Sequence, residues 1–352
     1  MTVHDLNDMQ RYLVEEEAEK WREGDITRRE FIRRVTLLVG GVAAAGGVLL
    51  SLGCDPNSPT VQPTSASQST PTTEPTSAVA PAATATEAGA QPTATTGSGQ
   101  GSQSPYHVPE DSPDVKAEMV SIPTSDASVK LMGYLATATA PRMGPGAGPA
   151  KPAGILVIHE NRGLTPHIKD VVRRLAKENY VAMCVDLVSR QGGSDSHPDE
   201  AERTGILGQM TPEQVVSDLS AGLDYLKSRE DVAPDKLGVV GFCFGGGYTW
   251  RMATKRQDLK AAVPYYGPNP PLEDVPNIKA AVLGIYGEND TRITSGVPAL
   301  EEALKQAGVT YKINIYPGAE HAFHNDTGPR YKQDAATDAW ERTLEWFRQY
   351  LV

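Results

Sequence analysis

The chain contains one cysteine whose neighbours are typical of a catalytic nucleophile. Cys243 lies in the run GFCFGG directly after the apolar stretch 237–240, so a buried strand, the pattern G-x-C-x-G and the start of a helix follow one another. This order is the nucleophile elbow, whose strained turn needs glycine on both sides, here Gly241 and Gly245. Free N–H groups and the dipole at a helix N-terminus favour a thiolate. The alternative is a buried structural cysteine, which is how we interpret Cys184, since it lies in an apolar stretch without such a frame.

An acid and a base follow the elbow in the order that a triad requires. Asp290 lies in the loop GEND after the apolar stretch 280–286, and His321 lies in AEHAF after the stretch 311–315. Both fall at the carboxyl ends of expected parallel strands, the edge at which α/β sites are built. Asp290 would accept a hydrogen bond from one ring nitrogen of His321, and the other nitrogen would take the thiol proton. Singly each could be a solvated loop residue, but together they predict a Cys243, Asp290, His321 triad.

The elements that must position these residues also follow from the pattern. Short apolar runs alternate with longer amphipathic ones after residue 115, which indicates parallel strands joined by crossover helices. We expect strands at 117–122, 129–135, 154–159, 181–185, 237–240, 261–265, 280–286 and 311–315, and helices at 165–178, 211–228, 245–255, 295–306 and 335–350. The sequence therefore predicts an α/β-hydrolase fold, with a mostly parallel eight-stranded sheet flanked by helices, in a catalytic domain spanning 111–352.

The motifs GFCFGG, GEND and AEHAF together resemble the dienelactone hydrolase (carboxymethylenebutenolidase) family over residues 115–352. The resemblance implies that Glu160, in the run HENRG, hydrogen-bonds and activates Cys243. The backbone N–H groups of Asn161 and Phe244 would form the oxyanion hole. It also implies that Arg190, in the run DLVSR, binds a substrate carboxylate. The alternative for Arg190 is a surface charge without a role in binding.

The sequence departs from the family at one position. The best-known members carry a second arginine four residues after the catalytic histidine, to grip the substrate carboxylate and hold the glutamate, whereas this chain has Asn325. We therefore expect weaker selection for anionic lactones, unless His324 or Arg162 supplies the missing charge.

The function that these residues predict is the cleavage of a small-molecule lactone or carboxylic ester through a cysteine acyl-enzyme. Two alternatives stay open, because a fold does not fix a substrate. One is a broader esterase, thioesterase or acyl peptidase, and the other is a non-catalytic envelope binding protein that keeps the fold.

The overall composition narrows the classes of function. The 33 basic and 44 acidic residues give a formal net charge of −11, which argues against a nucleic-acid partner. Three scattered cysteines are too few for a disulfide framework, and no H-E-x-x-H pair occurs. We expect no metal and no cofactor.

Residues 1–54 resemble an export segment. Arg28 and Arg29 precede the apolar run 35–52, as in a twin-arginine signal, so we expect the twin-arginine machinery to deliver the protein to the extracytoplasmic face of the membrane. Cys54 ends this run and resembles a lipoprotein processing site, which predicts a lipid anchor. The alternatives are an inert thiol and an uncleaved apolar anchor helix. The acidic stretch 1–26, with glutamates at 15–17, has no assigned function.

Residues 55–110 predict a linker between this segment and the catalytic domain. Thr, Ser, Pro, Ala and Gly dominate, and Val61 and Val79 are the only branched aliphatic residues before Pro105. Such a stretch cannot bury enough apolar surface to offset its ordering entropy, so we expect it to be disordered.

Overall fold

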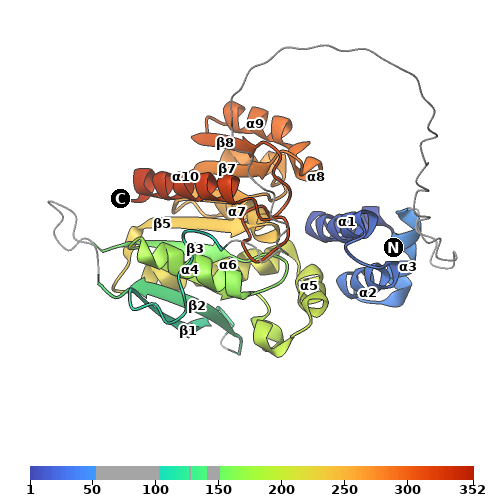
Figure 1. The fold of residues 1–352 in the computed structure, drawn as a ribbon, viewed down its shortest axis with the longest axis horizontal. Helices are drawn as coiled ribbons and strands as arrows, with labels where there is room; N and C mark the ends of the chain where they lie inside the picture. Colours follow the sequence, from blue (N-terminus) through green and yellow to red (C-terminus); the bar gives the residue numbers. More distant parts are fainter. Residues whose placement is uncertain (53–102, 127, 141–150) are drawn as a thin grey trace, which may run out of the picture. The chain divides into compact units, whose positions relative to one another are not determined.

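The computed structural model describes residues 1–52, 103–126, 128–140 and 151–352 (Figure 1). Cys54 and most of the predicted linker lie outside the described residues. The predicted domain boundary at 111 falls slightly late, because residues just before it already pack on the catalytic region. Val108 is 1% exposed and donates its N–H to Asp170, and Ser104 donates its N–H to Asp326.

Eight strands form one sheet in the order β1-β2-β4-β3-β5-β6-β7-β8. Only the pairs β1–β2 and β2–β4 are antiparallel among these ladders, and the other five are parallel. The strands are β1 Val115–Pro123, β2 Lys130–Ala138, β3 Ala153–Ile158, β4 Val181–Asp186, β5 Ala233–Phe242, β6 Leu259–Tyr265, β7 Ala281–Gly287 and β8 Tyr311–Tyr316. All eight expected strands are present with ends shifted by a few residues, and the predicted α/β-hydrolase fold is confirmed.

Five helices of the catalytic region correspond to the five expected ones, and the first, second, third and fifth of them in chain order pack against the sheet (Figure 1). They are α4 Pro166–Lys177, α6 Pro212–Ser228, α7 Phe244–Lys255, α9 Val297–Gln306 and α10 Gln333–Leu351. The strand interiors β3 and β4 are buried along their whole length, as expected for parallel strands covered on both faces. The described residues also form the single-turn α8 (Thr291–Thr294) and the 3₁₀ helices η1 Val3–Asp5, η2 Ser189–Gln191, η3 Ser194–Ser196 and η4 Leu272–Asn277.

Helix α5 (Glu200–Gln209) was not expected, because its two glycines lower its helix propensity. These glycines allow a close approach to another helix, α2. A Cβ on Gly205 would lie 2.7 Å from Cβ of Leu37, and one on Gly208 would lie 2.4 Å from a methyl carbon of Leu38. Tertiary packing therefore explains a helix that local propensity does not favour.

Three α-helices lie before the predicted linker: α1 Asp8–Glu23, α2 Arg28–Leu38 and α3 Val42–Ser51. Asn7 caps α1 by accepting a hydrogen bond from the N–H of Gln10, and Gly24 ends it in the left-handed conformation. None of the described helices is by itself long and apolar enough to cross a membrane. Helices α2 and α3 pass that test only as a pair, which is bent by 118°.

Candidate active site

Cys243 occupies a strained turn between β5 and the N-terminus of α7. Its φ of +58° lies in the left-handed region, which a non-glycine residue adopts only where the surroundings enforce it. The N–H of Cys243 donates to the carbonyl of Tyr265 at 3.1 Å. A Cβ on Gly241 would lie 2.2 Å from the carbonyl oxygen of Gly245, and a Cβ on Gly245 would lie 2.3 Å from that of Ile158. The turn therefore has the expected elbow geometry, and both glycines are required by close backbone contacts.

The structure brings the three predicted triad residues together. Nδ1 of His321 lies 2.5 Å from Oδ2 of Asp290, and both side chains are buried. A ring nitrogen of His321, Sγ of Cys243 and a carboxylate oxygen of Glu16 all lie within 4.8 Å of one another. Burial alone would lower the pKa of His321, but the charges of Asp290 and Cys243 outweigh it and raise this pKa to about 10.

A buried ion cluster fixes the loop that carries His321. Asp326 lies five residues beyond His321 and accepts hydrogen bonds from His167 at 2.8 Å and Arg174 at 2.7 Å. Burial would raise the pKa of Asp326, but the hydrogen bond from His167 and the charge of Arg174 outweigh it and hold this pKa well below its usual value. Arg174 also pairs with Asp170 on its own helix. The position of the catalytic loop therefore depends on charges that are shielded from solvent.

Glu160 and Asn325 form a direct pair beside the triad. Asn325 donates from Nδ2 to a carboxylate oxygen of Glu160 at 2.9 Å, and its side-chain Oδ1 accepts from the N–H and the hydroxyl of Thr327. The second carboxylate oxygen of Glu160 is buried and has no hydrogen-bond partner in the described part of the chain. Asn325 therefore does one of the two things expected of an arginine at this position, because it holds the glutamate.

Of the two predicted oxyanion-hole residues, Phe244 directly follows the nucleophile in the sequence, and Asn161, from a distant loop, lines the same cavity as Cys243. Phe244 is the first residue of α7, so its N–H has no acceptor within the helix. Asn161 follows Glu160 in a loop held by His159, which donates from Nδ1 to the carbonyl of Glu160 and accepts at Nε2 from the N–H of Leu187. Their role in holding an oxyanion stays a prediction.

Arg190 does not reach this site, which corrects the expectation that it binds substrate. It donates two hydrogen bonds to Asp218 of α6, at 2.9 and 2.7 Å, and it is not among the residues that line the cavity at Cys243. Asp218 is 1% exposed, and a buried carboxylate needs a charged or hydrogen-bonding partner. The alternative, a charge without a role in substrate binding, fits the observed pairing.

A cavity of about 320 Å³ opens onto the nucleophile. Of the two residues expected as sources of the missing charge, Arg162 lines this cavity and His324 does not. Burial also holds the pKa of His324 well below its usual value, so its ring is uncharged. The lining comprises Glu16, Lys20, Asp25, Ile26, Arg34, Glu160, Asn161, Arg162, Glu200, Cys243, His321, Ala322, Asn325, Gly328, Pro329 and Arg330.

The model of the dienelactone hydrolase family matches residues 142–351. The chain belongs to the dienelactone hydrolase family. A curated relative from Methylorubrum extorquens, named "Putative carboxymethylenebutenolidase", is 38% identical over 56% of this chain and 72% of its own. A relative of the same name from Salmonella typhimurium is 34% identical over 69% of this chain and 90% of its own. These relationships identify the protein as a hydrolase.

A solved structure supports the same assignment. The crystal structure of a "Putative Dienelactone Hydrolase" from Klebsiella pneumoniae superposes with a TM-score of 0.59 at 31% identity. The match covers 67% of this chain and 99% of the Klebsiella chain. The hydrolase region thus corresponds to nearly the whole of that solved protein.

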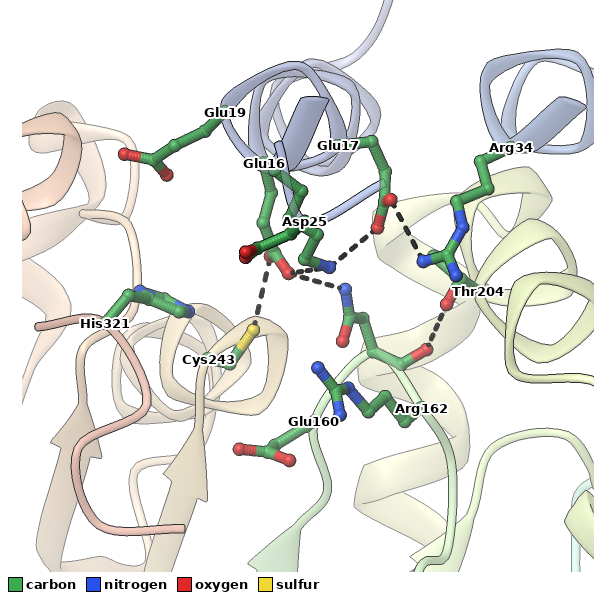
Figure 2. Close-up of polar contacts among 12 residues, drawn as sticks. Glu16, Glu17, Glu19, Asp25, Arg34, Glu160, Arg162, Thr204, Cys243 and His321 are labelled. Carbon is green, nitrogen blue, oxygen red and sulfur yellow. Dashed lines mark hydrogen bonds and ion pairs between the residues drawn. The ribbon is translucent and has the colours of Figure 1, made fainter. Parts of the chain in front are cut away.

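In this dienelactone hydrolase family member, helix α1 also contributes to the site, which the sequence analysis did not foresee. The hydroxyl of Tyr12 lies 3.1 Å from Sγ of Cys243, and Sγ donates to a carboxylate oxygen of Glu16 at 3.4 Å. Figure 2 shows Glu16 pointing from α1 toward Cys243. Tyr12, Glu16 and Lys20 recur every four residues and so share one face of a helix. That spacing was the available signal, but it does not reveal what the face contacts.

Proposed function

We propose that this hydrolase cleaves a small-molecule lactone or carboxylic ester through a thioester on Cys243. The observation that carries the proposal is the convergence of three groups. The strained elbow holds Sγ at a helix N-terminus, a ring nitrogen of His321 lies within 4.8 Å, and the His321–Asp290 bond orients that ring.

In the proposed reaction the sulfur of Cys243 attacks the carbonyl carbon, and the carbonyl oxygen becomes negatively charged. The backbone N–H groups of Asn161 and Phe244 would donate to this oxygen. When the intermediate collapses, the bond between the carbonyl carbon and the leaving oxygen breaks. His321 then gives the leaving oxygen the proton that it took from the thiol of Cys243. Water activated by His321 then attacks the thioester, which releases the carboxylic acid and restores the thiol.

The residues around the cavity support a substrate without a strict need for a negative charge. Asn325 gives its amide to Glu160, and Arg190 is paired with Asp218, so neither offers a free cation to a substrate. Lys20, Arg34, Arg162 and Arg330 line the cavity, and each of these cations already pairs with a carboxylate of the described chain; Arg162, for example, pairs with Glu200 at 3.2 Å. We therefore propose activity on neutral esters or lactones, with weaker selection for anionic ones than two arginines would give.

The test is hydrolysis of nitrophenyl butyrate and of a panel of lactones by the full chain. Cys243→Ala and His321→Ala should each lower turnover by several orders of magnitude, because members of a triad act as a unit. Cys184→Ala is the matched control, since Cys184 is buried in β4 and should not affect the chemistry beyond its packing. Retention of most activity in Cys243→Ala would refute the assignment. A chain with a reactive Cys243 but no turnover would instead be a binding protein.

We also propose that the protein is exported and held at the outer face of the membrane. Arg28 and Arg29 begin α2, ahead of the apolar run through α3, as a twin-arginine signal requires. Changing both arginines to lysine should leave the protein in the cytoplasm, and Cys54→Ala should release it from the membrane fraction. Unchanged delivery in the double variant would refute the twin-arginine route, and membrane retention of Cys54→Ala would indicate an uncleaved helix.

A further inference from the structure

Helix α1 places the hydroxyl of Tyr12 and the carboxylate of Glu16 beside the nucleophile, where the reacting carbonyl of a substrate must bind. Sγ of Cys243 has the Tyr12 hydroxyl at 3.1 Å and a Glu16 carboxylate oxygen at 3.4 Å, and Cys243 is only 3% exposed. A carbonyl carbon about to react must come within about 3 to 3.5 Å of the nucleophile. Tyr12 and Glu16 already occupy positions at this distance, and Glu16, Lys20, Asp25, Ile26 and Arg34 of the same segment line the cavity that opens onto Cys243. The segment therefore restricts the approach of a substrate to the sulfur while α1 remains in place.

We propose that residues 8–38 are an inhibitory segment that masks Cys243 in the intact chain, and that turnover requires this segment to be displaced. The inference rests on the proposed function only in taking Cys243 as the nucleophile.

The carboxylate of Glu16 is held in the site by specific partners. One oxygen accepts from Nδ2 of Asn161 at 3.0 Å and pairs with Nζ of Lys20 at 2.8 Å (Figure 2). Burial would raise the pKa of Glu16, but the charges of Lys20, His321 and Arg292 outweigh it and hold this pKa well below its usual value. A charged carboxylate beside the sulfur repels the thiolate, which is the attacking species. Glu16 therefore opposes the chemistry electrostatically as well as sterically.

Basic residues of the catalytic region match the acidic face of this segment. Arg292 pairs with Glu19 at 3.3 Å, and its guanidinium lies 4.6 Å from the centre of the Tyr12 ring. Arg330 pairs with Glu23 at 2.7 Å and with Asp25 at 3.0 Å. This complementarity gives the acidic stretch 1–26 a role, because its charges dock α1 over the active site.

Helix α2 connects the inhibitory contacts to the predicted export signal. Arg34 of α2 pairs with Glu17 of α1 at 3.1 Å, and the carbonyl of Leu37 accepts from the side chain of Gln209 in α5 at 2.7 Å. Export machinery that binds Arg28 and Arg29 must therefore bind α2, the helix that forms an ion pair with α1. Cleavage before Cys54 would also cut the covalent link between this segment and the hydrolase. The masking would thus persist, and keep turnover low, until the protein is exported.

The test releases α1 in the full chain without altering the catalytic residues. Met9 is buried, and its methyl carbon lies 3.3 Å from the position of a Cβ on Gly247 in α7, so Met9→Asp places a charge in this contact. Glu19→Arg replaces an ion pair with two like charges at Arg292. The double variant should detach α1, and Arg22→Asp, a charge reversal at an exposed residue of the same helix, is the matched control.

Two rates are measured in a Cys54→Ser background: alkylation of Cys243 by iodoacetamide, followed by peptide mass spectrometry, and kcat/KM for nitrophenyl butyrate. Buried Cys184 serves as an internal reference for unfolding. Both rates should rise at least tenfold in the double variant and stay within twofold of the parent in the control, since masking lowers the fraction of competent enzyme. Faster alkylation without any ester turnover would support the masking and refute the proposed hydrolysis.

Two results would overturn the proposal. One is unchanged alkylation in a double variant whose α1 has become sensitive to trypsin. The other is faster alkylation with reduced turnover, which would mean that α1 completes the active site rather than masking it. If the double variant unfolds or keeps α1 resistant to trypsin, Tyr12→Ala decides, because it uncovers Sγ but retains the ion pairs. Its alkylation rate should rise at least fivefold, and an unchanged rate would refute masking.

Discussion

The charge of Asp290 should control a large part of the pH dependence of stability. The pKa of the His321 ring is raised from 6.5 to about 10 in the fold, and the charge of Asp290 is the largest cause that raises it. At about 1.4 kcal/mol per pKa unit, this rise corresponds to roughly 4 to 5 kcal/mol of stability. Because the folded pKa lies above the unfolded one, that contribution is fully present below pH 6.5 and is lost as the pH rises toward 10.

Asp290→Asn removes the charge but keeps the shape of the side chain. Without the charge of Asp290, the burial of His321 lowers its pKa with less compensation. The pKa of His321 should therefore fall, and most of this contribution to stability should disappear. Urea unfolding of parent and variant at pH 6 and pH 10 measures the effect. The variant should be less stable than the parent by several kcal/mol at pH 6, and by clearly less at pH 10.

The control is Asp274→Asn, which removes a carboxylate paired with Lys255 near the surface. It should cost less than about 1 kcal/mol, with no comparable dependence on pH across this range. A stability difference between parent and Asp290→Asn that is the same at pH 6 and pH 10 would refute the reasoning.

Three further predictions follow from the same contacts. Asn325→Arg should lower KM for a carboxylate-bearing lactone about tenfold while leaving neutral esters nearly unchanged, since about 1.4 kcal/mol is one decade; an unchanged ratio of the two specificity constants would contradict it. Gly245→Ala puts a Cβ 2.3 Å from a backbone oxygen of Ile158, so urea unfolding should show a loss of about 1 to 3 kcal/mol together with lower turnover, and a fully stable, active variant would contradict the close approach. Asp326→Asn should cost about 3 kcal/mol of unfolding free energy, because it leaves His167 and Arg174 short of a buried negative charge; a loss under 1 kcal/mol would show that Asp170 alone is enough.

The sequence predicted the sheet and the convergence of the triad because the signals there are local. An apolar strand followed by Gly241, Cys243 and Gly245 specifies the elbow within a few residues. Asp290 and His321 lie directly after apolar strands, and parallel pairing brings the carboxyl ends of those strands to one edge.

The contacts that the sequence did not predict depend on partners far along the chain. The direction of Arg190 is set by Asp218 on another helix, and the hydrogen bond from Asn325 to Glu160 joins segments at opposite ends of the hydrolase region. The sequence shows that α1 is rich in glutamate, but it does not show what these glutamates contact. Their partners Arg292 and Arg330 lie far along the chain, and only the fold brings them next to α1.

The most direct test of the central claim is to trap the acyl-enzyme. The full chain is mixed with the nitrophenyl ester of a bulky acid that deacylates slowly, quenched in acid, and analysed by intact mass and peptide mapping. We predict one acyl group on the peptide that contains Cys243, removed by neutral hydroxylamine and absent from Cys243→Ala. Ester turnover with no acyl group on Cys243, or the same acylation in Cys243→Ala, would contradict the account.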